Sequence, residues 1–205
     1  MKKKWIILSV TAIFVSEIVL LYKIFDLNHI IVLKNNMIDN LSIKYYTMQQ
    51  QYPLGILNSG KYAKDRMLVD TSGNEISLSD FVNTHGGKII ICRFAELECQ
   101  ECIKYAVSVI NKHKDVFDMT RVLFLANTKS KRIFKLQNKE YNIQKYNVLN
   151  CVEDLGIQAE QIEYPYFIVI DNELRVCGIY FPKKSTHGTD FDFKNVKLMY
   201  ENLVK

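Results

Sequence analysis

Apolar and amphipathic stretches alternate along residues 65–205, and this pattern predicts an α/β domain. The domain opens with two short strands within 67–77 and a short helix around 79–83. The other expected elements are strands 88–94, 121–127, 147–152, 166–170 and 174–181, and helices 103–117, 131–141 and 193–204. Because helices separate most strands while the last two strands follow each other directly, we expect a mixed sheet flanked by helices on both faces.

A long apolar run lies near the N-terminus, at residues 5–21, directly after Lys2, Lys3 and Lys4. Its length suits a membrane-spanning helix. Lysines on its N-terminal side predict a cytoplasmic N-terminus, with the C-terminal domain periplasmic or extracellular. A cleaved signal peptide is the alternative. We prefer an uncleaved, single-pass anchor in the inner or plasma membrane, because neither a small-residue cleavage site nor a cysteine for lipid attachment follows Leu21.

Residues 26–51 contain neither glycine nor proline and carry one helical stripe. The stripe consists of Leu27, Ile31, Lys34, Ile38, Leu41, Tyr45 and Met48. It predicts a helical stalk that ends near 52–55, where a proline and a glycine interrupt the pattern, followed by a linker over 56–64. The stripe could serve as a dimer seam or rest on the chain's own domain. The expected organisation is therefore 1–25 cytoplasmic tip and transmembrane anchor, 26–64 helical stalk and linker, and 65–205 folded domain.

Composition fits one folded domain with an N-terminal appendage. The 205 residues are 48% hydrophobic and 12% aromatic, which is enough apolar material for a core of normal size. The net charge of +5 comes from scattered lysines rather than from a basic stripe interleaved with aromatic residues. We therefore expect no nucleic-acid partner.

The strongest chemical signal is the pair Cys99 and Cys102, which lies between an apolar strand and a predicted helix. Unpaired N–H groups and the dipole at a helix N-terminus favour a thiolate at Cys99. Cys102 lies one turn deeper, within reach of a disulfide. This arrangement suits a redox couple. Far downstream, Pro165 directly precedes a second apolar strand.

With these features the chain resembles the thioredoxin superfamily, and within it the membrane-anchored TlpA-like branch of thiol-disulfide oxidoreductases. The resemblance covers about residues 65–205, including the opening hairpin and Phe94, five residues before Cys99. It implies a thioredoxin-like fold. It also implies that Cys99 attacks, that Cys102 resolves the mixed disulfide, and that Pro165 is a cis proline facing the disulfide.

Three positions depart from the family pattern. Glu98 replaces the usual tryptophan before the first cysteine, Gln100 and Glu101 stand between the cysteines, and Arg93 occupies a position that often holds a buried acid. Arg93 could stabilise the Cys99 thiolate, or it could be a structural residue paired with Glu96 or Glu98.

The two acidic neighbours affect the expected direction of electron flow. Glu98 and Glu101 should raise the pKa of the Cys99 thiol through like-charge repulsion, and a less stable thiolate makes a weaker oxidant. We therefore expect a reductase or isomerase rather than an oxidase. Its partners would be cysteine-containing extracytoplasmic proteins and an integral-membrane thiol carrier that donates electrons.

Other uses of the cysteine pair fit less well. Structural zinc needs further close ligands, covalent haem needs a histidine in place of Ile103, and copper delivery needs wider cysteine spacing with a histidine such as His187 suitably placed. We expect no metal and no cofactor besides the disulfide. Glu96 stands where a peroxidase would carry a threonine. A tethered, non-catalytic protein-binding module remains the main alternative. Cys92, Cys151 and Cys177 are expected to be small buried apolar residues, although a second bridge among them stays open.

Overall fold

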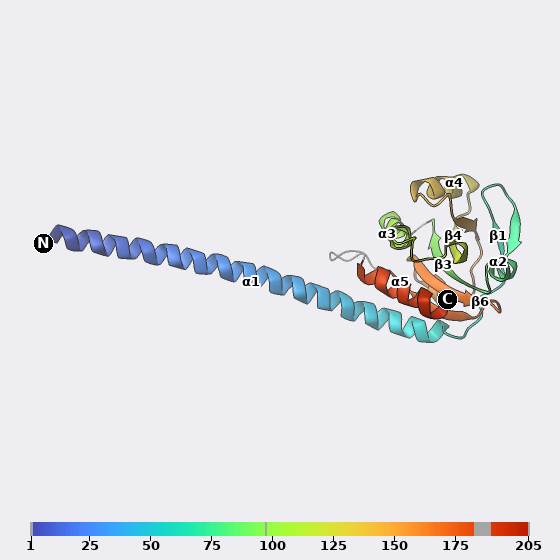
Figure 1. The fold of residues 1–205 in the computed structure, drawn as a ribbon, viewed down its shortest axis with the longest axis horizontal. Coiled ribbons are helices and arrows are strands. Elements are labelled where there is room, and N and C mark those ends of the chain that lie inside the picture. Colours follow the sequence, from blue (N-terminus) through green and yellow to red (C-terminus); the bar gives the residue numbers. More distant parts are fainter. Residues whose placement is uncertain (1, 97, 183–189, 205) are drawn as a thin grey trace. The chain divides into compact units, whose positions relative to one another are not determined.

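A computed structural model describes residues 2–96, 98–182 and 190–204. Within these ranges, the side chains of residues 2–15, 40, 43–54, 56, 190 and 191 are not described. The chain divides into two compact units, Met1–Tyr46 and Thr47–Lys205, and each is considered by itself. Figure 1 labels the helices and those strands for which there is room.

The first element is one long helix, α1, which runs from Lys2 to Asn58. The predicted end near 52–55 is wrong, because the helical bond from Ser59 N–H to the Gly55 carbonyl (2.9 Å) continues the ladder beyond it. Gly60, with φ of 75°, then supplies the left-handed conformation that commonly ends a helix. The buried Asn58 fixes this end, since its Oδ1 accepts the Gln158 N–H at 2.8 Å.

The membrane segment expected at residues 5–21 falls mostly on side chains that are not described. Among the residues that the structure does describe, no helix is long and apolar enough to cross a membrane.

The second unit contains a seven-stranded mixed sheet in the order β2-β1-β5-β4-β3-β6-β7. Its strands are β1 Met67–Val69, β2 Glu75–Ser77, β3 Lys88–Ala95, β4 Val122–Asn127, β5 Asn147–Asn150, β6 Tyr166–Asp171 and β7 Val176–Tyr180. Strands β3, β4 and β5 are parallel, and the remaining pairings are antiparallel. The mixed sheet expected from the sequence is confirmed.

Helices cover both faces of this sheet. They are α2 Leu78–Thr84, α3 Gln100–Asn111, α4 Lys131–Glu140 and α5 Asp190–Leu203, with short 3-10 turns η1 Met119–Arg121 and η2 Gln158–Gln161. Alternate residues of β3 point to opposite faces. Ile90, Cys92 and Phe94 pack in the core with α3 and α5, whereas Ile89 and Ile91 pack in the core with α2. The central strand β3 is therefore buried on both sides, and its C-terminal end leads directly to the cysteine pair.

Candidate active site

The two cysteines lie at the N-terminus of α3 and form a disulfide, with a Cα–Cα distance of 5.1 Å. Cys99 is the N-cap residue, and Cys102 lies in the first turn. Cys99 is exposed, whereas Cys102 is half-buried. An external thiol or disulfide can thus approach Cys99 more readily than Cys102.

The helix terminus sets the electrostatic environment of Cys99. The Cys102 N–H points to the Cys99 sulfur at 3.3 Å, so the sulfur serves as the cap of α3. The N–H groups of Cys102 and Ile103 also donate to the Cys99 carbonyl at 2.9 and 3.0 Å, which begins the helix at this residue. In the reduced protein these donors and the helix dipole would favour a Cys99 thiolate.

Arg93 is buried in β3 and bonded on all sides. Its Nε donates to Glu160 Oε1 at 2.9 Å, and Nη1 donates to the carbonyls of Ala126 (3.1 Å) and Cys151 (3.0 Å). Its Nη2 donates to the Glu153 carbonyl (3.1 Å) and to Glu160 Oε2 (3.4 Å). These acceptors match the five N–H donors of a guanidinium group.

Arg93 is an ion-paired structural residue, as one of the two sequence-based interpretations has it, but the expected acidic partners and the expected contact with the Cys99 sulfur are wrong. Its ion-pair partner is Glu160 rather than Glu96 or Glu98, and its donors are used by acceptors other than the Cys99 sulfur. Tyr166 completes the network by donating its hydroxyl to Glu160 Oε1 at 2.7 Å. Arg93 thus ties the ends of β4 and β5 to η2 and to the start of β6.

The acidic residues flanking Cys99 differ sharply in their surroundings. Burial raises the pKa of Glu98 from 4.5 to about 7, with Glu160 and Glu163 adding to the rise and Arg93 opposing it. The Oε2 atom of Glu98 is buried and has no hydrogen-bond partner among the described residues. Glu101, in contrast, is exposed and lies 3.4 Å from Lys104 Nζ. The Glu98 charge therefore depends on pH near neutrality, while that of Glu101 is exposed to solvent and close to a lysine.

We expect Glu98→Gln to remove a pH dependence of stability. A carboxyl whose pKa is raised on folding binds a proton that the unfolded chain releases, so its contribution to stability falls as pH rises from about 4.5 to about 7. Urea unfolding should show a variant that gains about 2–3 kcal/mol over wild type at pH 8 and much less at pH 5. Glu101→Gln is the matched control. An equal difference at both pH values would contradict the burial of Glu98.

Pro165 is buried and immediately precedes β6. The resemblance implies a cis peptide bond before it, and this is wrong: all peptide bonds among the described residues are trans. Sequence letters do not fix this isomer, because the trans form of an X–Pro bond is favoured by only about 0.5–1 kcal/mol. Pro165 directly precedes a strand, as expected, and that strand, β6, pairs with β3.

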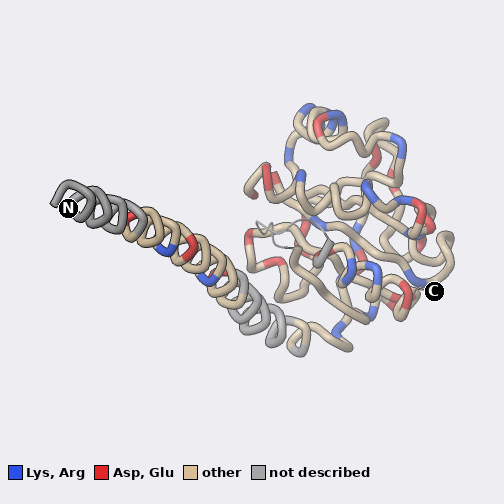
Figure 2. The backbone as a smooth tube through the Cα atoms, turned by 60° about the vertical axis from the view of Figure 1, so that its left-hand side comes forward, with Lys and Arg blue, Asp and Glu red and all other residues tan. Residues whose placement is uncertain are grey.

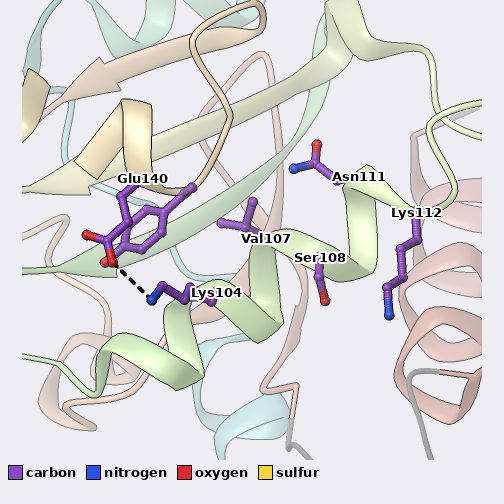
Figure 3. A pocket seen from close by; sticks show the side chains of 7 residues that line it. Lys104, Val107, Ser108, Asn111, Lys112 and Glu140 are labelled. Atoms are coloured by element: carbon purple, nitrogen blue, oxygen red, sulfur yellow. Dashed lines mark ion pairs between the residues drawn. The ribbon is translucent and has the colours of Figure 1, made fainter. Parts of the chain in front are cut away.

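Gln100, between the two cysteines, connects the start of α3 to the end of α4. Its Nε2 donates to both carboxylate oxygens of Glu140 at 2.9 and 3.0 Å, and Lys104 Nζ lies 3.0 Å from the same carboxylate. Figure 3 shows this Lys104–Glu140 pair at a shallow pocket of about 300 Å³. The pocket is also lined by Val107, Ser108, Asn111, Lys112 and Tyr141.

The other three cysteines are free. Cys92 and Cys151 are buried, as expected, and Cys177 is half-buried. Burial raises the pKa of each of these thiols, with the nearby Glu98 adding to the effect at Cys92. These three thiols are therefore poorer nucleophiles than the Cys99 thiol. His187, which bears on the copper alternative, lies outside the described residues.

Sequence reasoning missed Glu160, Tyr166 and Glu140. An arginine in an apolar strand does signal a buried acidic partner, because an unpaired buried charge is costly. The sequence offers no means of choosing Glu160, which is 67 positions away, among the acidic residues of the chain.

Comparison with known proteins identifies the fold. No protein-family model and no curated protein match the sequence. A crystal structure from Chlorobium tepidum, named as a thiol:disulfide interchange protein DsbE, matches with a TM-score of 0.55 at 13% identity, covering 73% of this chain and 99% of that one. The fold is thioredoxin-like. The C-terminal domain of a Bacteroides thetaiotaomicron protein named as a thiol-disulfide oxidoreductase matches with a TM-score of 0.51 at 15% identity, covering 72% and 97% of the two chains.

The thioredoxin-like fold expected from the resemblance is thus confirmed, and it carries the Cys99–Cys102 pair at the start of α3.

Proposed function

We propose that this protein is a membrane-anchored thiol-disulfide oxidoreductase that acts outside the cytoplasm as a reductase or isomerase. The observation that carries this proposal is the disulfide at the N-terminus of α3, with Cys99 exposed, in a thioredoxin-like domain. The lysines at positions 2–4 and the apolar run at 5–21 support the anchor and its orientation.

The proposed reaction uses each cysteine once. The Cys99 thiolate attacks one sulfur of a client disulfide, which forms a mixed disulfide and releases the other client sulfur as a thiolate. The Cys102 thiolate then attacks the Cys99 sulfur and releases the second client sulfur. The client gains two electrons and two protons, and the protein is left with its own disulfide. A membrane-embedded dithiol carrier would supply the electrons that reduce it again.

Glu98 is the residue that favours the reducing direction. When ionised, its partly buried carboxylate beside Cys99 disfavours the thiolate, and a less stable reduced form gives a more reducing couple. Glu101 contributes less, because solvent and Lys104 weaken its field.

The proposed chemistry can be tested by equilibrating the folded protein with glutathione and dithiothreitol. We expect Cys99 and Cys102 to interconvert between dithiol and disulfide without unfolding, as measured by alkylation and mass spectrometry. Glu98→Gln should make the couple more oxidising by about 10–30 mV at pH 8, with a smaller shift at pH 6, where wild-type Glu98 is already protonated. Glu101→Gln should change the potential little at either pH.

A disulfide that resists dithiothreitol in the folded protein would contradict the redox proposal. The tethered protein-binding module, with Cys99–Cys102 as a structural bridge, would then be the better account. An unchanged potential in Glu98→Gln would remove Glu98 from the mechanism and leave the disulfide exchange intact.

The membrane topology is tested separately. Alkaline phosphatase fused after Lys205 should be active in intact cells, and the fusion should stay in the membrane fraction, because the lysines at positions 2–4 hold the N-terminus in the cytoplasm. Fusion to a cytoplasmic reporter at the same site is the control and should be inactive. The opposite pattern would reverse the orientation, and a shortened N-terminus in the mature protein would replace the anchor by a signal peptide.

A further inference from the structure

The first unit carries an apolar seam that the proposed redox chemistry does not use. Within α1, residues 24, 27, 31, 34, 38 and 41 follow one another at alternating intervals of three and four. This is the heptad spacing that places a and d positions along one side of a helix. By sequence the same spacing continues to Tyr45 and Met48.

The described apolar side chains of the seam are exposed. Their exposed fractions are Ile24 47%, Leu27 57%, Ile31 52%, Ile38 62% and Leu41 62%. All five lie in the unit Met1–Tyr46. An apolar row on a helix, here interrupted only at Lys34, favours a covering surface, because burial of such a row, rather than intrinsic propensity, supplies most helical stability.

The residue types along the seam indicate what covers it. Isoleucine occupies the a positions, Ile24, Ile31 and Ile38, and leucine occupies the d positions, Leu27 and Leu41. This division is the one that favours a parallel coiled coil of two strands. A second copy of the same helix offers the complementary surface that this division of isoleucine and leucine favours.

The polar residues agree with this assignment. Over residues 34–42 the apolar side chains are Met37, Ile38 and Leu41 alone, at positions g, a and d. Asp26 and Asp39 occupy c and b positions, away from the seam, and Figure 2 shows the charged residues spaced along the described part of α1. Over residues 34–42 the apolar strip is narrow enough for one neighbouring helix, whereas over residues 24–33 Phe25, Val32 and Leu33, at b and c positions, are exposed as well.

From these observations we infer that the α1 helices of two copies form a parallel, in-register coiled coil over residues 24–41. Covering the exposed seam and the adjoining g positions on both helices buries roughly 1,000–1,500 Å² in total, which is the scale of a specific protein interface. Lys34 at a d position faces its counterpart across the seam. A polar residue in the core of a coiled coil lowers its stability.

Cross-linking of the full chain in detergent tests the pairing and its direction. Single cysteines are introduced at Leu27 or Leu41, in a background with serine at 99, 102 and 177, and joined with a short bis-maleimide. Both positions should give covalent dimers, because a parallel register brings each residue next to its own copy. Cysteines in place of His29 or Asn36, at f positions on the outer side, are the matched controls and should give almost none.

Each other pattern contradicts the inference. A dimer at only one seam position indicates an antiparallel or shifted arrangement. Equal products at seam and f positions indicate non-specific association, and no product at the seam indicates that the helix is covered by its own domain or by another protein.

Light scattering measures the assembly without added cysteines. Wild type should have twice the protein mass of Ile31→Asp/Ile38→Asp, whereas His29→Asp/Asn36→Asp should retain the wild-type mass. Lys34→Leu should remain associated at greater dilution than wild type, because it removes the polar pair from the seam. A monomeric wild type, or a Lys34→Leu variant that dissociates more readily than wild type, would overturn the inference whatever the aspartate variants do. None of these measurements depends on the redox activity of Cys99.

Discussion

Cys102→Ser should convert the protein into a covalent trap for its clients. Cys99 would still attack client disulfides from its exposed position at the start of α3, but no second thiol would remain to release the mixed disulfide. We expect Cys99-linked species to accumulate from near absence in wild type to a readily isolated fraction on non-reducing gels. Mass spectrometry of these species would identify the clients.

Three further variants test whether Cys99 is the thiol that forms the trapped species. Cys99→Ser should trap almost nothing, since the remaining Cys102 is half-buried. Cys177→Ser in the Cys102→Ser background should leave the trapped species unchanged, because Cys177 is not the attacking thiol. Pro165→Thr should enrich the same species in an otherwise wild-type chain by loosening the loop before β6. If Cys102→Ser and Pro165→Thr both capture no partner, the disulfide-exchange proposal fails.

Arg93→Met should lower the free energy of unfolding by about 3–5 kcal/mol, because it leaves the buried Glu160 carboxylate without its cation. The same change also removes the N–H groups that donate hydrogen bonds to the carbonyls of Ala126, Cys151 and Glu153. Urea unfolding of the oxidised protein at pH 7 measures the loss.

The matched control is Arg66→Met, which removes an arginine that pairs with the exposed Glu153. It should cost less than about 1 kcal/mol, as exposed ion pairs usually do. Adding Glu160→Gln to Arg93→Met should recover part of the loss, because the uncompensated charge disappears. A cost for Arg93→Met no larger than that of the control would show that the buried network contributes little to stability.

The strands were predictable because burial on both faces leaves an unbroken apolar signal. β3 is the clearest case, since its sequence is apolar apart from the first residue and Arg93, and its predicted start at 88 is the observed one. The position of Cys99 before a helix was equally readable, because a strand, two spaced cysteines and an amphipathic segment follow one another directly.

The end of α3 shows where periodicity misleads. Val116 and Phe117 extend the apolar pattern to 117, but the helix ends at Asn111. Phe117 is apolar because it packs against Phe193 and Tyr200, with ring centroids at 6.3 and 5.1 Å. A contact with α5 thus produces the same sequence signal as one more helical turn.

The site was predictable in its cysteines but not in its supporting contacts. Cys99 and Cys102 are close in sequence, so their spacing alone places both sulfurs at one helix end. The partner of Arg93 and the isomer before Pro165 depend on how distant segments meet, and no local pattern records either one. Similarly, the different environments of Glu98 and Glu101 arise from tertiary burial, although both residues stand beside a cysteine.

The burial of Cys92 and Cys151 has a consequence for the life of the chain before it folds. In the nascent, extended polypeptide all five thiols are equally open to oxidants, and any two could join. Folding removes Cys92 and Cys151 from this competition and leaves Cys99 exposed, with Cys102 and Cys177 half-buried. In an oxidising compartment, correct maturation therefore requires the sheet to fold faster than the thiols are oxidised. Slow-folding variants should accumulate as forms with wrongly paired or intermolecular disulfides rather than as simply unfolded protein.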